Sequence, residues 1–234
     1  MIGSGVTVLG LTGSIAMGKS EAAKAFRRLG VPVFDADAVV HRLIGPGGAA
    51  VAQVAKLFPG VERGGGIDRQ ALGARVFGDS EALRRLEAVL HPLVGVARRR
   101  FLQRCGARRV PLAVLDIPLL YEGHGASLCD AVAVVSAPPF VQRARALSRP
   151  GMTPAKLEAI QARQMPDREK RRRADFVIPS GLDKRVSLRA IRRLLTMAAA
   201  PGAAAPGAAA PRAKASKRSR TGLAKDRGFA RNRP

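Results

Sequence analysis

Tryptophan is absent from this 234-residue chain, tyrosine occurs once and cysteine twice. Proteins that bind single-stranded nucleic acid stack bases on aromatic side chains, so an aromatic content of 4% disfavours that role for the folded part. Cys105 and Cys129 form no Cys-x-x-Cys pair, and His41, His91 and His124 have no metal-ligand spacing. These absences argue against a zinc site and indicate reduced interior thiols.

Long apolar runs are also missing. No stretch of about 18 apolar residues is free of charge, proline and glycine, so no membrane span is expected. Residues 1–5 lack the basic region of a secretory signal and lead directly into the first predicted strand. We therefore predict a cytoplasmic protein.

Acidic residues are scarce: 17 Asp and Glu face 41 Lys and Arg, a net charge of +24. A basic body suits polyanionic ligands such as nucleotides, but a coding bias towards Arg, Ala, Gly and Pro explains the same composition. Residues 201–234 carry nine basic residues and one acid. We expect the folded domain (1–197) to be followed by an Ala/Pro/Gly linker and a basic disordered tail (198–234) that contacts RNA or anionic surfaces weakly.

A phosphate-binding pattern, G-x-x-x-x-G-K-[ST], occupies residues 13–20. A buried strand is predicted before it (6–11) and a helix after it (20–29). In this context backbone N–H groups and the helix dipole favour an anion. Lys19 is then expected to reach the β- and γ-phosphates and Ser20 to hold Mg²⁺.

The predicted elements alternate between strand and helix. Strands are expected at 6–11, 31–34, 110–117, 131–135 and 175–178, and helices at 20–29, about 81–104, and 139–148. This order favours an α/β fold with a parallel five-stranded sheet flanked by helices. We predict an inserted helical substrate subdomain at about 38–109 and an arginine-rich lid at about 149–173.

Carboxylates follow two of the predicted strands. Asp35 and Asp37 lie beyond the second strand, and an extended segment would point both side chains the same way, so that one accepts a proton from a substrate hydroxyl. The alternatives are a solvated Asp-Ala-Asp turn or a cap on the next helix. Asp116 ends the third strand and is expected to support Mg²⁺. The apolar Leu119, Leu120 and Tyr121 then line a substrate pocket.

Arginines supply the remaining candidates. Arg145 and Arg149 share one helix face with Gln142 nearby, so they suit a lid over phosphates; a solvated surface helix is the alternative. The basic tract 170–173 is expected to be a solvated helix end. His91 and Pro92 are expected to follow a helix that ends at Leu90, and His91 is not expected to act as an acid or base.

Taken together, the motifs and their order resemble the dephospho-CoA kinase family. The segments that carry the resemblance are residues 10–20, 31–37, 67–69, 86–92, 116–122, 142–149, 163–166 and 174–178. The resemblance covers about residues 6–195. It implies a P-loop kinase fold and transfer of the γ-phosphate of ATP to the ribose 3′-hydroxyl of dephospho-CoA, the last step of coenzyme A synthesis.

The resemblance also implies roles for individual residues. Catalysis is expected from Asp37, Lys19 and Arg145, and metal binding from Ser20 and Asp116. ATP is expected to contact Gly13, Ser14, Ile15, Ala16, Met17, Gly18, Lys19, Ser20, Glu21 and Arg149. Dephospho-CoA is expected to contact Asp35, Asp37, His91, Leu119, Leu120 and Tyr121.

Two residues depart from the family pattern. Ala16 stands where the family usually has glycine, so a positive φ there would cost about 1 kcal/mol. Glu21 follows Ser20 where the family usually has threonine, and its carboxylate would compete with the α-phosphate for backbone amides. The segment 179–181 stands where many relatives have an asparagine that could contact adenine, so no adenine contact is assigned.

Two other functions compete with this one. Shikimate-type kinases also combine a phosphate loop with an Asp-x-Asp segment, although the long 38–109 stretch and the 116–122 motif disfavour them. The second is a basic nucleic-acid-binding protein with a weakened nucleotide site, which the tail favours and the low aromatic content disfavours.

Overall fold

A five-stranded parallel sheet forms the centre of the computed structural model, which describes residues 5–199 except 124 and 182. Its strands run in the order β2-β5-β1-β6-β7. These strands are β1 (Thr7–Thr12), β2 (Val33–Asp35), β5 (Leu112–Asp116), β6 (Ala131–Ser136) and β7 (Phe176–Pro179). The predicted parallel sheet is thus confirmed, and all carboxyl ends lie at one edge.

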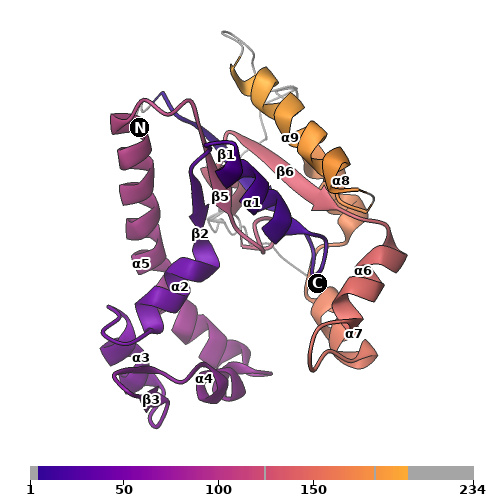
Figure 1. The fold of residues 1–234 in the computed structure, drawn as a ribbon. Coiled ribbons are helices and arrows are strands. Elements are labelled where there is room, and N and C mark those ends of the chain that lie inside the picture. Colours follow the sequence, from indigo (N-terminus) through magenta and orange to yellow (C-terminus); the bar gives the residue numbers. More distant parts are fainter. Residues whose placement is uncertain (1–4, 124, 182, 200–234) are drawn as a thin grey trace, which may run out of the picture.

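Alternate residues of each strand face opposite helical layers. Leu112 and Val114 of β5 pack in one cluster with α1 (Lys19–Arg28) and α9 (Lys184–Ala199), which lie side by side (Figure 1). Ala113 and Leu115 face the other way, towards α5. Because both faces are covered, every residue of β5 is buried, as expected for a central parallel strand.

Between β2 and β5 the chain forms a helical insertion. Its elements are α2 (Ala36–Ile44), α3 (Val51–Leu57), the hairpin β3 (Glu62–Arg63) and β4 (Gly66–Ile67), α4 (Arg69–Val76), and α5 (Ser80–Ala107). Buried side chains such as Val54, Phe58 and Leu86 give this part its own apolar cluster.

The helix predicted at about 81–104 is confirmed, but the helix end expected at Leu90 is wrong, because α5 continues through His91 and Pro92 to Ala107. Proline removes one helical hydrogen bond, but buried apolar contacts hold α5 both before and after Pro92. Its first half packs in the insertion, through Leu86, and its second half packs on the sheet, through Cys105. Tertiary packing therefore outweighs the tendency of Pro92 to end a helix.

After β6 the chain forms α6 (Pro139–Leu147), α7 (Pro154–Ala162) and α8 (Asp167–Arg173), the last packed against β6. The prediction that 170–173 is a solvated helix end is wrong for Lys170, whose side chain is fully buried. Its Nζ lies 3.0 Å from Oε1 of Glu122, because a buried ammonium requires a partner charge.

Both cysteines are free, as predicted. A short 3₁₀ helix, Gly125–Leu128, completes the described elements. Within the described ranges no helix is long and apolar enough to cross a membrane. The basic tail lies outside the described residues.

Candidate active site at the carboxyl edge of the sheet

The phosphate loop joins β1 to α1, and glycine is required at two of its positions. A Cβ on Gly13 would meet the carbonyl oxygen of Val135 at 2.7 Å. Gly18 has φ 88° and caps α1 without a side-chain hydrogen bond. The first N–H groups of α1 thus have no side-chain cap, and Ser14 Oγ is buried with no hydrogen-bond partner among the described residues. These unsatisfied groups fit a phosphate.

Ala16 has a φ of 60°, so the position does require the left-handed conformation. The conformational cost of about 1 kcal/mol therefore applies. Its methyl group is buried in a small cluster with Ala146 of α6 and Leu157 of α7. This burial offsets part of the cost and packs the loop against α6 and α7.

Glu21 does not turn towards the loop amides, so the predicted competition with phosphate is not seen. Its carboxylate lies 2.9 Å from Lys24 Nζ and 3.6 Å from Lys184 Nζ. The hydrogen bond and charge of Lys24 lower the pKa of Glu21. The carboxylate is held on the outer surface of α1.

Lys19 forms an ion pair with Asp116, whose side chain is 5% exposed, at 2.5 Å. The sheet explains this contact, because Asp116 ends β5 and is paired in register with Leu11 of β1 and Asp35 of β2. Burial raises the pKa of Asp116, Lys19 opposes the shift, and the charges of Asp35 and Asp37 add to it. The predicted acids and the loop lysine therefore share one site.

The predicted extended segment at Asp35 and Asp37 is wrong. Asp35 ends β2 and is the N-cap of α2, with its Oδ1 accepting the Ala38 N–H at 2.9 Å. Its other oxygen lies 3.4 Å from Arg27. Asp37 lies in the first helical turn and is exposed. Because Asp35 caps α2, the extended backbone ends at Asp35 and does not reach Asp37. The Asp35 carboxylate is therefore bound to the helix start, whereas the Asp37 carboxylate is exposed.

Arg145 reaches the phosphate loop through Ser180, which follows β7. Its guanidinium donates to the Ser180 carbonyl at 2.6 Å and to Ser180 Oγ at 3.3 Å. Ser180 Oγ donates in turn to the carbonyl of Met17 at 2.5 Å. Ser180 was not predicted as a site residue, since a lone serine after a strand carries no signal. Arg149 is exposed and lies two residues beyond the end of α6, so the prediction that it shares a helix face with Arg145 is wrong.

Ile15 of the loop is bound by two glutamines. Its N–H donates to Gln164 Oε1 at 3.0 Å, and its carbonyl accepts from Gln142 Nε2 at 2.9 Å. The Ile15 N–H, predicted to contact ATP, is therefore used within the protein. Gln142 was singled out with the arginines of α6, whereas Gln164 appeared only inside the family motif 163–166.

The predicted acceptor residues are placed in different environments. Leu119 is 47% exposed, and Tyr121 is half-buried. Leu120 has no exposed surface and packs against Val132 and Val134, so its side chain belongs to the core and does not line an open surface. His91 is exposed on α5.

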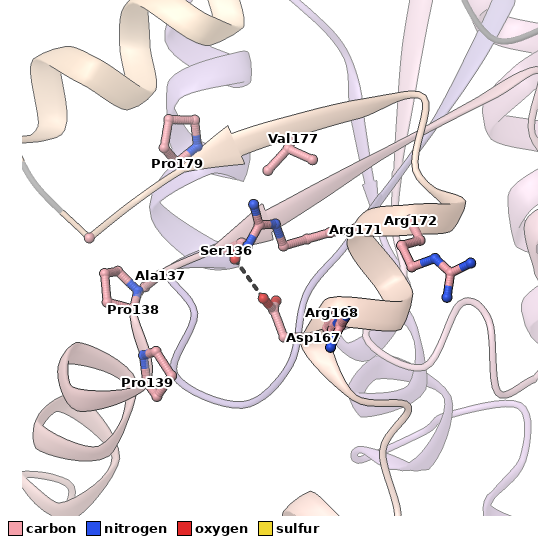
Figure 2. A pocket seen from close by; sticks show the side chains of 11 residues that line it. Ser136, Ala137, Pro138, Pro139, Asp167, Arg168, Arg171, Arg172, Val177 and Pro179 are labelled. Atoms are coloured by element: carbon pink, nitrogen blue, oxygen red, sulfur yellow. Dashed lines mark hydrogen bonds between the residues drawn. The ribbon is translucent and has the colours of Figure 1, made fainter.

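A separate cavity of about 870 Å³ lies between α6, α8 and β7. Figure 2 shows the side chains that line it. Arg168, Arg171 and Arg172 border it, and Ser136 donates to Asp167 at 2.8 Å within it. None of the predicted site residues lines it. A hollow of about 430 Å³ does include Asp35, on the outer side of β2.

No group of three or more His, Cys, Asp or Glu residues in the described ranges could hold a metal ion alone. The oxygen ligands available near the loop are Asp116 and the Ser20 hydroxyl. Hard oxygen ligands suit Mg²⁺, which commonly uses one or two protein ligands together with phosphate oxygens and water.

Comparisons with known proteins agree on one family. The family model described as dephospho-CoA kinase matches residues 7–183. A dephospho-CoA kinase of Paramagnetospirillum magneticum is 64% identical over 164 residues, covering 70% of this chain and 77% of the relative. One from Rhodospirillum rubrum is 57% identical over 192 residues, covering 82% and 91%.

Solved structures share the fold. A Thermus thermophilus protein has a TM-score of 0.73 at 33% identity, covering 83% of this chain and 98% of that protein. Dephospho-CoA kinase from Campylobacter jejuni has a TM-score of 0.58 at 22% identity, with the same two coverages. With the family match over residues 7–183 and relatives above half identity, the chain belongs to the dephospho-CoA kinase family.

Proposed function

We propose that this protein transfers the γ-phosphate of ATP to the ribose 3′-hydroxyl of dephospho-CoA, giving coenzyme A and ADP. The observation that carries the proposal is the Lys19–Asp116 ion pair at 2.5 Å. It lies beside a phosphate loop whose helix has no side-chain cap. Membership of the dephospho-CoA kinase family supports the choice of acceptor.

In the proposed reaction the acceptor oxygen attacks the γ-phosphorus as the bond to the ADP oxygen breaks. Asp37, exposed in the first turn of α2, accepts the proton of the 3′-hydroxyl. Lys19 and Arg145 stabilise the charge that develops on the transferred group. Ser20 and Asp116 would hold Mg²⁺, which neutralises phosphate charge when it is bound.

We assign a proposed role to each of two segments outside the phosphate loop. The helical insertion, about 38–109, would receive dephospho-CoA, because its first helix carries Asp37. The segment 149–173 would act as a lid, because α7 packs on the phosphate loop at Ala16. We place the reaction in the cytoplasm, where the free thiols of Cys105 and Cys129 would stay reduced.

Release of ADP tests the proposal, with Mg²⁺-ATP and dephospho-CoA, shikimate or adenosine as acceptors. We expect turnover with dephospho-CoA alone, and loss of about 10²-fold or more in kcat for Asp37→Asn. Turnover with shikimate instead would identify the rival kinase class. Full activity of Asp37→Asn would remove Asp37 as the base while leaving the acceptor assignment intact.

The predicted contact of the tail with RNA rests only on charge, since residues 201–234 carry nine basic residues and one acid. A chain shortened after Met197 provides the test. Loss of salt-sensitive RNA binding in the shortened chain would support the contact between the tail and RNA. Unchanged RNA binding would contradict it.

A further inference from the structure

We propose that Gln142 and Gln164 are positioning residues that clamp the backbone of Ile15 and so couple docking of the lid to the shape of the phosphate loop. The proposal deepens the proposed function and rests on it for the identity of the nucleotide. Neither side chain is assigned to the reacting atoms. Their effect on catalysis would pass through the loop.

The clamp uses both polar groups of one peptide residue. Gln164 accepts from the Ile15 N–H at 3.0 Å, and Gln142 donates to the Ile15 carbonyl at 2.9 Å. An N–H can only donate and a carbonyl can only accept, which fixes the orientation of each side-chain amide. The remaining oxygen of Gln142 accepts from Gln161 Nε2 at 3.2 Å, consistent with that orientation.

The three glutamines come from two segments of the chain, α6 and the end of α7. Gln142 is buried on α6, Gln161 lies on α7, and Gln164 follows α7. The adjoining apolar contact of Ala16 with Ala146 and Leu157 joins the same elements. The loop and the lid therefore meet through amide hydrogen bonds and a small apolar cluster.

The clamp lies next to the strained position of the loop. Ile15 directly precedes Ala16, which has a φ of 60°. Holding both the N–H and the carbonyl of Ile15 keeps that carbonyl directed at α6. A carbonyl free to turn towards the nucleotide would place negative charge near the phosphates. The clamp thus leaves the N–H groups of the following turn to face the anion.

The clamp also connects to the acceptor side of the site. Met165, the residue after Gln164, donates its N–H to Glu122 Oε1 at 2.8 Å. Glu122 lies in the same turn segment as the exposed Leu119. Two consecutive residues between α7 and α8 therefore hold the phosphate loop and the turn segment 117–123 together.

Two Gln→Glu variants give a sharp test, because they add the same charge but differ in hydrogen bonding. Gln164→Glu keeps the acceptor that the Ile15 N–H needs. Gln142→Glu loses the donor and sets a carboxylate against the Ile15 carbonyl. We expect the KM for ATP to rise about tenfold or more for Gln142→Glu and about threefold or less for Gln164→Glu. The KM for dephospho-CoA should change less than that for ATP.

A second variant at the same position separates positioning from folding. Gln164→Met keeps the size but removes the acceptor, so the KM for ATP should rise about tenfold and hydrogen exchange at the Ile15 amide should quicken. Gln164→Glu should restore both. Gln103→Glu, an exposed glutamine of α5, is the matched control and should leave both unchanged.

Equal KM values for ATP in the two Gln→Glu variants, or unchanged exchange at Ile15 in Gln164→Met, would overturn the clamp. Calorimetric titration with ATP alone provides a readout that does not need turnover. If wild-type protein binds ATP but does not phosphorylate dephospho-CoA, the proposed function fails, while the ATP affinities of the variants still decide the clamp.

Discussion

The Nζ atom of Lys19 lies 2.5 Å from Oδ1 of Asp116, although the whole helical insertion lies between the two residues in the sequence. One begins α1 after the phosphate loop, and the other ends the neighbouring strand β5. Parallel strands bring their carboxyl ends to one edge, which places the two charges together. The carboxylate of Asp116 thus orients the loop lysine towards this edge of the sheet.

The first prediction concerns this ion pair. Asp116→Asn keeps the shape of the side chain but removes its charge, so we expect kcat to fall about 10- to 100-fold. Lys19→Ala removes the phosphate ligand itself and should cost about 10³-fold in kcat/KM. Steady-state kinetics at saturating dephospho-CoA measure both. Near-normal kcat for Asp116→Asn would contradict the assigned role of its charge.

The second prediction separates the two acids after β2. Asp35→Ala removes the N-cap of α2 and should lower the free energy of unfolding by about 1 kcal/mol. Asp37→Ala removes an exposed side chain and should leave stability nearly unchanged while abolishing most activity. Urea unfolding and the ADP assay, applied to both variants, give the comparison. A reversed pattern would reassign the base to Asp35.

The third prediction concerns Ala16, which combines a φ of 60° with a buried methyl group. Glycine would relieve about 1 kcal/mol of conformational cost but lose about 0.8 kcal/mol of methyl burial. Ala16→Gly should therefore change the free energy of unfolding by less than about 0.5 kcal/mol. Urea unfolding measures it. A loss above about 1.5 kcal/mol would mean that packing of the methyl group against α6 and α7 dominates.

The fourth prediction concerns the buried pair of Glu122 and Lys170, 3.0 Å apart. Lys170→Met leaves the carboxylate without its cation and should destabilise the fold by about 3 kcal/mol. The double variant with Glu122→Gln should recover part of this loss. Chemical unfolding of the three variants and the wild type forms a double-mutant cycle. Additive single effects would show that the pair is not coupled.

Acid should weaken the same pair. Burial raises the pKa of Glu122, but the Met165 N–H and Lys170 outweigh it, so the pKa lies below its ordinary value of 4.5. A carboxylate with a lowered pKa contributes stability that is present above 4.5 and is lost as pH falls through the folded-state value. The free energy of unfolding should therefore drop more steeply in acid for the wild type than for the double variant. Equal slopes would contradict this.

Local sequence patterns were enough to predict the strand, loop and helix that form the phosphate site. The apolar run before residue 13 and the glycine spacing in 13–20 predicted a strand, loop and helix, and all three are present. Asp116 was expected at a strand end, where it lies. Such features depend on near neighbours in the sequence, because strand burial and glycine conformation are set within a few residues.

Other features depended on partners far along the chain. The burial of Lys170 follows from Glu122, 48 positions earlier, and the continuation of α5 through Pro92 follows from packing at both ends of the helix. The cap at Asp35 was weighed as an alternative but could not be chosen from the sequence. Local preference allowed both strand and helix start there.

The sequence by itself determined the parallel sheet, the phosphate loop and the family, because these follow from local periodicity and from motifs whose order is written in the chain. Only the tertiary structure decided that Ser180 holds Arg145 over the loop and that Gln142 and Gln164 grip Ile15. A glutamine or serine is compatible with many partners. Which one it takes is fixed when packed helices bring distant backbone groups within hydrogen-bond distance.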